Sequence, residues 1–435
     1  MSDTPPTVVT NWSGNQSCSP LAVHTPTSTA EVARIVSAAA ESGDQVKVIG
    51  AGHSFTSAAM TDGVLLRLDG LASVEGVDVL GVATVGAGIS LSALNRELRS
   101  RGRGLPNLGD IDKQSLAGAT ATATHGTGAQ LGNLSTGIVG LELVTGTGEV
   151  LWCDTIENAD VFRAARVSVG ALGIITRIAI ETVPAFNLHS VESPEPIGDL
   201  LKHWEDFINS AQHIEFFWMP GTQIGLVKRN NPTSRDGSTL RTAKDKAEKL
   251  LVENMAFGAA MRTVRRFPGT REFITTAIGG LVSGTERIDR SERIFVTPRH
   301  VRFMEMEYGI PVAAVPEAFR RVQELASAMP DPPAFPVEVR VSAADDIDLS
   351  TAEGRDSGWI AVHRYQGVPY DDYFKGVEEI MNDYDGRPHW GKFHYQTAET
   401  LAPRYPQWDA FAAIRNRTDP DRLFANTYTQ RVLGN

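Results

Sequence analysis

The sequence predicts an α+β protein with two domains, and three observations support this prediction. The chain has 435 residues, more than one ordinary hydrophobic core accommodates. In its first part, short strands run into glycine-rich turns that are followed by helices. After about Val183 the pattern changes, and aromatic residues gather in a strand at Phe216-Phe217-Trp218. We therefore predict one domain at residues 14–184 and a second at residues 185–435.

The expected elements follow from residue spacing and turn residues. Residues 27–41 are predicted to form a helix, capped by Thr27 or Ser28, because apolar side chains follow at helical spacing. Gly146-Thr147-Gly148 separates two short apolar runs, which predicts a hairpin. The remaining predictions are a helix at 91–101 and strands at 46–49, 64–68, 83–85, 141–145, 150–153, 338–342 and 359–365.

Composition excludes several classes of protein. A net charge of −11 argues against nucleic acid as the main partner, because phosphate neutralisation needs a basic surface. Cys18 and Cys153 are too few for a disulfide framework, which favours a reducing cytoplasm. Residues 1–20 lack the apolar segment of a secretory signal, and the longest apolar stretch, 273–282, is too short to span a membrane. We therefore expect a cytoplasmic location.

The most informative segment is Val48-Ile49-Gly50-Ala51-Gly52-His53-Ser54-Phe55. A β-branched strand ends in a turn with alternating glycines, and an imidazole follows. Closely spaced backbone amides in such a turn form a concave nest that suits a phosphate group. His53 could therefore cap the turn or reach the molecule to which that phosphate belongs.

A second glycine-rich segment, residues 115–128, is crowded with small side chains. Such residues let the backbone approach something flat and bulky. Gly86-Ala87-Gly88 lacks the third glycine and the acidic partner of a dinucleotide fingerprint, so a nicotinamide site is poorly supported. One extended cofactor that lies across several loops explains these segments better.

Three motifs resemble the PCMH-type FAD domain of the vanillyl-alcohol-oxidase flavoproteins: residues 50–54, residues 123–128 and residues 173–176. His389-Trp390-Gly391-Lys392 is similar to the HWxK motif of the sugar-lactone and polyol oxidases, such as D-arabinono-1,4-lactone oxidase, L-gulono-1,4-lactone oxidase or dehydrogenase, and alditol oxidase. The resemblance implies an FAD-binding domain, then an α+β substrate (cap) domain, and a C-terminal tail that returns to the FAD domain.

The resemblance also implies a covalent bond between His53 and the 8α carbon of FAD. The alternative is a histidine that only hydrogen-bonds the turn. No cysteine lies near Ser115, so a single linkage is expected. His125 invites a catalytic interpretation, but the resemblance favours a structural role near the flavin. The expected cofactor-binding residues are Gly50, Ala51, Gly52, His53, Ser54, Phe55, Gly109, Asp110, Ser115, Gly118, Thr122, His125, Gly126, Gly128, Gly173 and Ile175.

Glu338 and Arg340 lie two residues apart on a predicted strand, so both side chains point to one face. They could form an ordinary cross-sheet ion pair. The resemblance instead implies that Glu338, Arg340 and Lys392 are catalytic, because cations near a developing alkoxide stabilise its charge. The residues expected to contact substrate are Asp110, His363 and Trp390. His389 and His394 are not expected to bind a metal, because no carboxylate or cysteine follows at ligand spacing.

The function implied is oxidation of a hydroxyl on a sugar-derived 1,4-lactone, with hydride transfer to flavin N5 and electrons passed to O2 to give H2O2. The resemblance implies that Gly109 lies beside the flavin and leaves access for O2, which favours an oxidase. It also implies that Asp110 replaces a serine with which polyol oxidases contact their substrate, which favours a lactone. The alternatives are a lactone dehydrogenase with a cytochrome- or quinone-type acceptor, an alditol (polyol) oxidase, or a catalytically silent carbohydrate-binding protein on a flavin scaffold. The oligomeric state is left open.

Overall fold

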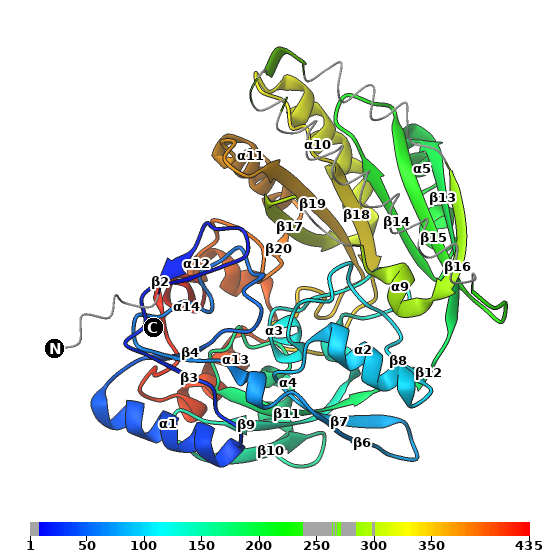
Figure 1. Ribbon diagram of the computed structural model, residues 1–435. Helices are drawn as coiled ribbons and strands as arrows, with labels where there is room; N and C mark the ends of the chain where they lie inside the picture. The colour runs from blue at the N-terminus through cyan, green and yellow to red at the C-terminus, as the bar shows by residue number, and fades with distance from the viewer. Residues whose placement is uncertain (1–7, 238–262, 264–265, 267, 271–283, 298–300) are drawn as a thin grey trace.

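The computed structural model describes residues 8–237, 263, 266, 268–270, 284–297 and 301–435. The apolar stretch at 273–282 lies outside these residues. Among the residues described, no helix combines the length and apolarity needed to cross a bilayer. Figure 1 shows two lobes, one built mainly from the first part of the chain and the other carrying a large sheet.

The first lobe contains a small parallel sheet in the order β3-β5-β4 and an antiparallel sheet in the order β10-β9-β11-β7-β6. Its helices are α1 (Thr29–Ser42), α2 (Leu91–Ser100), α3 (Leu116–Ala121) and α4 (Ala159–Ala165). Its strands are β1 (Val9–Thr10), β2 (Ser17–Cys18), β3 (Ala22–His24), β4 (Val46–Val48), β5 (Val64–Leu66), β6 (Val74–Val77), β7 (Val82–Gly86), β8 (Arg103–Gly104), β9 (Ile138–Val144), β10 (Val150–Asp154), β11 (Ile174–Glu181) and β12 (Val183–Pro184). Short 3₁₀ turns lie at Leu68–Gly70 and Leu134–Gly137.

Local sequence explains the boundaries of these elements. The Ser28 hydroxyl accepts a hydrogen bond from the Glu31 amide and starts α1, and Gly43 ends it with a left-handed φ of 74°. The predicted hairpin is confirmed, because β9 and β10 pair antiparallel with Val144 opposite Val150. The predicted strand at 64–68 is shorter than expected, since the chain turns into a 3₁₀ helix at Leu68.

The second lobe carries an antiparallel sheet in the order β16-β13-β15-β14-β18-β19-β17-β20. Its strands are β13 (Asn187–Pro196), β14 (His213–Trp218), β15 (Ile224–Thr233), β16 (Thr285–Arg290), β17 (Phe303–Pro311), β18 (Val337–Ser342), β19 (Ser357–Tyr365) and β20 (Arg387–Pro388). The helices of this lobe are α5 (Ile197–Lys202), α6 (Trp204–Ile208), α9 (Ser291–Phe295), α10 (Val315–Ala328) and α11 (Asp371–Asn382). The later helices α12 (Ala398–Leu401), α13 (Trp408–Thr418) and α14 (Thr427–Leu433) pack in the core of the first lobe. Further 3₁₀ turns lie at Pro268–Thr270, Val312–Ala314 and Ala402–Arg404.

The two faces of the large sheet differ in chemistry. One face is apolar: Val337, Val339 and Val341 of β18 pack in a core with side chains of α5, α6, α10 and α11. The other face of β18 presents Glu338 and Arg340, and in Figure 1 this side of the sheet is turned toward the first lobe. The strand period of two therefore separates the core from a charged face, as predicted.

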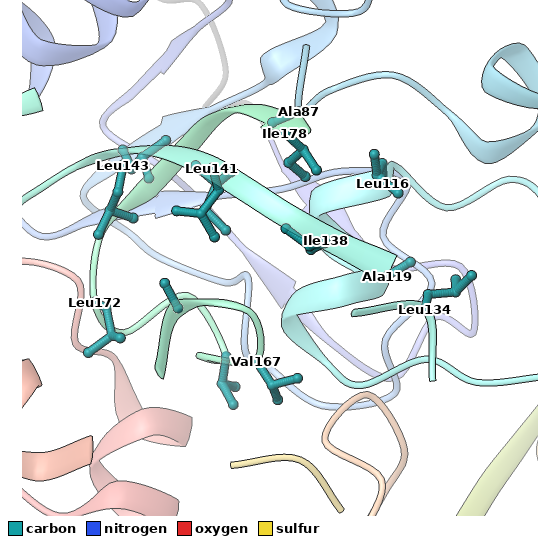
Figure 2. Close-up of a cluster of buried hydrophobic side chains, with 14 of the residues drawn as sticks. Ala87, Leu116, Ala119, Leu134, Ile138, Leu141, Leu143, Val167, Leu172 and Ile178 are labelled. Carbon is teal, nitrogen blue, oxygen red and sulfur yellow. The ribbon is translucent and has the colours of Figure 1, made fainter. Parts of the chain in front are cut away.

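The C-terminal segment returns to the first lobe. Leu423, Phe424 and Tyr428 belong to the same core as the β4, β9 and β11 side chains, and the Val46 amide donates to the Leu423 carbonyl. Figure 2 shows another part of this core, to which α3 contributes Ala119 and β9 contributes Ile138. The predicted α+β fold with a returning tail is confirmed.

Candidate functional site

A large open cavity of about 1190 Å³ runs through the first lobe. Its walls are the turn after β4, the start of α3, the turn that precedes β11, and Phe424 from the returning tail. A cavity of this size and position is typical of a cofactor site. The predicted cofactor-binding residues that line it are Gly50, Ala51, Gly52, His53, Ser54, Ser115, Gly118, Thr122, Gly173 and Ile175.

The turn after β4 fits a group that the backbone must approach closely. A side chain at Gly50 would place its Cβ 2.2 Å from the Ser115 hydroxyl oxygen, so no larger residue fits there. Gly52 has a φ of 65°, a left-handed conformation that glycine adopts without strain. These two glycines let the turn lie against the start of α3. The residues present therefore fit a large cofactor such as FAD.

A second cavity of about 580 Å³ adjoins the first, because His53, Ser54, Gln114 and Thr122 line both. The large sheet contributes Phe303, Glu307 and Arg340 to its wall. The other lining residues are Trp12, Phe55, Gly109, Asp110, Ile111, Thr124, His125, His389, Gly391 and Lys392. His53 thus lies where the cofactor cavity opens toward the charged face of the sheet.

His53 is held beside an aromatic ring and two cations. Its ring centroid lies 5.6 Å from that of Trp12. Burial, assisted by the nearby Lys392 and Lys113 ammonium groups, lowers the pKa of His53 below its usual value. The imidazole is therefore neutral near pH 7, which is the state in which its nitrogen is a nucleophile.

The charged face of the sheet brings the predicted catalytic residues together. The Arg340 Nε lies 3.4 Å from the Glu338 Oε1, and both side chains are buried. Lys392 reaches the same region from the segment after β20, where its Nζ lies 5.6 Å from the Phe55 ring centroid. Among the described residues, Arg340 and Lys392 line the second cavity, whereas Glu338 does not.

Two carboxylates that the sequence analysis missed complete this cluster. The Lys392 Nζ lies 2.5 Å from the Glu305 Oε1, and the Arg340 Nη2 lies 2.7 Å from the Glu307 Oε1. Both glutamates belong to β17, which pairs with β19. The alternation Phe303-Met304-Glu305-Met306-Glu307 was the available signal, since it places two carboxylates on one face of a strand.

The ion pairs keep these buried groups charged. Burial alone would raise the pKa of Glu305, but the Lys392 ammonium and the His363 imidazole together outweigh it, and the pKa falls to about 2. Burial would likewise lower the pKa of Lys392, yet Glu305 and Glu307 together raise it above its usual value. Glu338 and Glu307 also outweigh the burial of Arg340 and raise its pKa. Two permanent cations therefore face the second cavity.

His125 is packed on all sides. Its Nδ1 donates to the Gly126 carbonyl at 2.8 Å, and its ring stacks on Trp359 with centroids 3.8 Å apart. Gly126 and Gly128 line neither cavity: Gly126 packs against Asn107, and the Gly128 amide donates to the Val341 carbonyl at 2.9 Å. This loop therefore attaches the first lobe to β18.

His363 and Trp390, both expected at the substrate, do not line the second cavity. The His363 Nε2 lies 3.5 Å from the Glu305 Oε1, and its Nδ1 donates to the Pro336 carbonyl. Trp390 is fully buried, and its indole nitrogen donates to the Leu349 carbonyl at 2.7 Å. The tryptophan therefore holds the segment that carries Lys392.

Two groups of side chains have the spacing of metal ligands: His125, Glu307 and His389, and Glu305, Glu338 and His363. In both groups, however, a carboxylate is already paired with Arg340 or Lys392. These cations would repel a divalent ion at the same place. The His394 Nε2 is instead hydrogen-bonded to the Tyr428 hydroxyl, away from His389.

Comparisons with known proteins agree with this geometry. Residues 178–432 match the D-arabinono-1,4-lactone oxidase family, and residues 20–154 match an FAD binding domain. L-Gulono-1,4-lactone dehydrogenase of Mycobacterium tuberculosis strain H37Rv is 46% identical over 430 residues, which cover 98% of each chain. L-Gulonolactone oxidase of Bos taurus is 31% identical over 436 residues, which cover 97% of each chain.

Among solved structures, cholesterol oxidase from B. sterolicum superposes with a TM-score of 0.77. The superposition covers 98% of this chain and 97% of the cholesterol oxidase chain. Because the sequence identity is only 18%, this similarity supports the fold and no specific function. The family match spans more than half of the chain, and it includes the strands and the segment that carry the charged cluster. The chain belongs to the D-arabinono-1,4-lactone oxidase family.

Proposed function

We propose that this protein oxidises a hydroxyl group of a sugar-derived 1,4-lactone and passes the electrons to O2, which gives H2O2. The observation that carries the proposal is the position of Arg340 and Lys392. Both cations line a cavity of substrate size that opens onto His53 and the cofactor cavity. The lactone specificity named for the relatives from M. tuberculosis and B. taurus supports the same substrate class.

Bound FAD would supply the acceptor for the hydride that leaves the hydroxyl-bearing carbon. The walls of the larger cavity, which include the glycine turn at residues 50–52, would hold it. We propose that His53 anchors it covalently, because the imidazole is neutral and lies at the junction of the two cavities. His125, Gly126 and Gly128 would support this site by fixing the loop to the sheet.

Arg340 and Lys392 would act on the substrate hydroxyl. Their charges favour loss of its proton and stabilise the alkoxide that develops. Glu338 does not line the cavity, so it would act on the substrate by holding Arg340, to which it is paired. Asp110 lines the same cavity and would accept a hydrogen bond from another hydroxyl of the ring. Trp390 and His363 would position Lys392 and Glu305 and would not touch the substrate.

We also propose a domain boundary near residue 184. β12 pairs with β8 of the first lobe, and β13, which follows it, lies in the large sheet. The second domain, residues 185–435, would include the C-terminal segment, although that segment packs in the first core. Cys18 and Cys153 are both free and buried, which supports a reducing cytoplasmic location.

The decisive experiment is anaerobic reduction of the purified flavoprotein by a panel of lactones and alditols. L-Gulono-1,4-lactone and D-arabinono-1,4-lactone are expected to bleach the visible flavin absorption, and an alditol is expected to bleach it more slowly. Admission of air should then restore the absorption and release H2O2. Bleaching by alditols alone would show a polyol oxidase. The absence of bleaching by every compound would contradict an enzymatic role and favour a carbohydrate-binding protein.

A lactone dehydrogenase is the second candidate, and the name of the 46% identical relative favours it. The two possibilities differ in the step after reduction. An oxidase recovers its flavin absorption rapidly in air, whereas a dehydrogenase recovers only when a dye, quinone or cytochrome is added. Turnover in air with and without an added dye separates them.

A further inference from the structure

Two glutamates of β17, Glu305 and Glu307, each form an ion pair with one of the two cations that line the substrate cavity. Glu305 and Glu307 lie two residues apart on one face of the strand, while Met304, Met306 and Tyr308 pack in the core on the other face. Each carboxylate contacts a different cation: Glu305 contacts Lys392, and Glu307 contacts Arg340. All of these side chains are buried or nearly buried.

We infer that Glu305 and Glu307 are positioning residues with separate tasks, in which Glu305 holds Lys392 and Glu307 holds Arg340 at the substrate cavity. This inference rests on the proposed function and adds to it two residues that act through others. A buried cation without such a partner would have to lose its charge or turn toward water.

Lys392 depends most on its partner. A lysine has a flexible stem and a compact charge, so its geometry is set by what the ammonium contacts. The groups that face it are the carboxylates Glu305 and Glu307, the guanidinium of Arg340, and the imidazoles of His53 and His389. Burial lowers the pKa of Lys392, and Glu305 is the principal group that raises it again. Loss of Glu305 therefore removes the contact that holds the ammonium and lowers the pKa of Lys392.

Arg340 is held from more than one side. Its Nη2 contacts Glu307, and its Nε lies 3.4 Å from the Glu338 Oε1. Its Nη1 donates to the His125 carbonyl at 3.5 Å. Glu307 also lies 3.4 Å from the His125 Nε2, so it connects the guanidinium to the loop of the first lobe. Glu307 therefore sets the orientation of Arg340, whose charge is permanent.

Double-mutant cycles test the separate tasks. The variants Glu305→Gln and Glu307→Gln are each made in the wild type, in Lys392→Met and in Arg340→Met, and anaerobic flavin reduction by L-gulono-1,4-lactone is measured. Each single glutamine variant should slow reduction by about tenfold to a hundredfold, the effect of a misplaced catalytic group. Glu305→Gln should cost less than about twofold in Lys392→Met but keep its full effect in Arg340→Met.

Glu307→Gln should show the opposite pattern. If a glutamine variant slows flavin reduction equally in Lys392→Met and in Arg340→Met, the inference is overturned. Such a result would mean that the glutamate supports the structure in general and not one particular cation. Glu378→Gln is the matched control. This buried glutamate accepts a hydrogen bond from the Tyr395 amide and contacts Tyr308 on the other face of β17, and its substitution should leave reduction unchanged.

A second measurement does not depend on activity. Competitive acetylation of the holoenzyme at several pH values, followed by peptide mass spectrometry, gives the pH midpoint at which Lys392 becomes reactive. Glu305→Gln should lower this midpoint by at least about one pH unit, as expected on removal of a neighbouring charge. In Glu305→Asp the acetylation midpoint of Lys392 should stay close to the wild-type value, because the carboxylate is kept, while reduction by the lactone stays slow. This variant replaces Glu305→Gln if the glutamine variant does not fold.

An unchanged midpoint in Glu305→Gln would contradict the inference whatever the activity. A wild-type protein that no lactone reduces, combined with a lowered midpoint in the variant, would contradict the proposed function and support Glu305 as the partner of Lys392. The two proposals can therefore fail separately.

Discussion

The imidazole of His125 stacks on the indole of Trp359, with ring centroids 3.8 Å apart and planes inclined by 23°. His125 belongs to the glycine-rich loop of the first lobe, and Trp359 belongs to β19 of the large sheet. The contact therefore joins the two lobes directly beside the charged cluster. The Trp359 indole nitrogen also donates to the Ser342 hydroxyl at 3.0 Å, which fixes the tryptophan in turn.

The first prediction concerns this contact. His125→Gln should lower the free energy of unfolding by about 1–3 kcal/mol, because it removes an aromatic pair and a buried hydrogen bond. Urea unfolding followed by tryptophan fluorescence measures the change. His189→Gln, at a partly exposed ion pair with Glu286, should change stability by less than about 0.5 kcal/mol. Equal effects of both variants would show that the stacked ring contributes nothing.

The second prediction tests Lys392. Lys392→Met should retain FAD and slow anaerobic reduction by L-gulono-1,4-lactone at least about a hundredfold, the usual loss for one preorganised charged donor. Stopped-flow absorbance measures the rate. Lys375→Met is the control, because this exposed lysine of α11 lies over the Tyr395 ring, away from the substrate cavity. Reduction at the wild-type rate in Lys392→Met would remove Lys392 from the mechanism.

The third prediction tests the covalent anchor. After acid precipitation, the wild-type flavin should stay with the protein pellet, whereas the flavin of His53→Ala should appear in the supernatant. The reason is that only the imidazole of His53 is expected to bond to FAD. His24→Ala, at an exposed position, should behave like the wild type. Flavin in the wild-type supernatant would show that FAD is held without a covalent bond.

The fourth prediction concerns O2. A Cβ at Gly109 would lie 3.1 Å from the His125 carbonyl oxygen and 3.6 Å from the Thr124 Cγ2, so a methyl group fits only tightly in this wall. Because the added methyl group would occupy the space that we expect Gly109 to leave for O2, Gly109→Ala should slow reoxidation by O2 at least about tenfold. This corresponds to a rise of about 1.4 kcal/mol in the barrier. Reduction by the lactone should change less. Gly104→Ala, where a Cβ meets nothing closer than 4.0 Å, should leave both steps unchanged.

The fifth prediction follows from the buried Lys47. Its Nζ donates to the carbonyls of Gly170 and Phe424, and burial lowers its pKa to about 7. In the unfolded chain the pKa is near 10.4, so the unfolded state binds more protons between about pH 7 and 10. The stability of the wild type relative to Lys47→Met should therefore rise over this range, by at most about 1.4 kcal/mol per pH unit.

Urea unfolding at pH 7, 8 and 9 measures this difference. Parallel pH profiles for the wild type and Lys47→Met would show that the lysine does not titrate in this range. Lys113→Met provides the control, because its side chain is largely exposed and should not alter the profile.

Local patterns were sufficient to predict much of the first lobe. The cap at Ser28, the glycine turn before His53 and the hairpin at residues 146–148 depend on residues close in sequence. The alternation in β18 also predicted that Glu338 and Arg340 share a face. These features could be predicted because turn chemistry and strand period act within a few residues.

The partners of the two cations could not be predicted in this way. Glu305 meets Lys392 because β17 pairs with β19 and then with β20, and this strand order depends on long-range pairing. The orientation of Trp390 is likewise set by packing against Leu349 and Tyr405, from distant parts of the chain. A family motif identifies such a residue without telling whether it faces substrate or core.

The returning tail has a consequence for how the flavoprotein matures. The Asn426 side-chain amide donates to the carbonyls of Ser57, Ala58 and Met60, across a separation of up to 369 residues, and Phe424 forms part of the cofactor cavity wall. While the ribosome has made only the first lobe, this wall is missing. We therefore expect FAD to be captured only after the chain has been synthesised beyond Asn426, and the bond that we propose between His53 and FAD would form after that point.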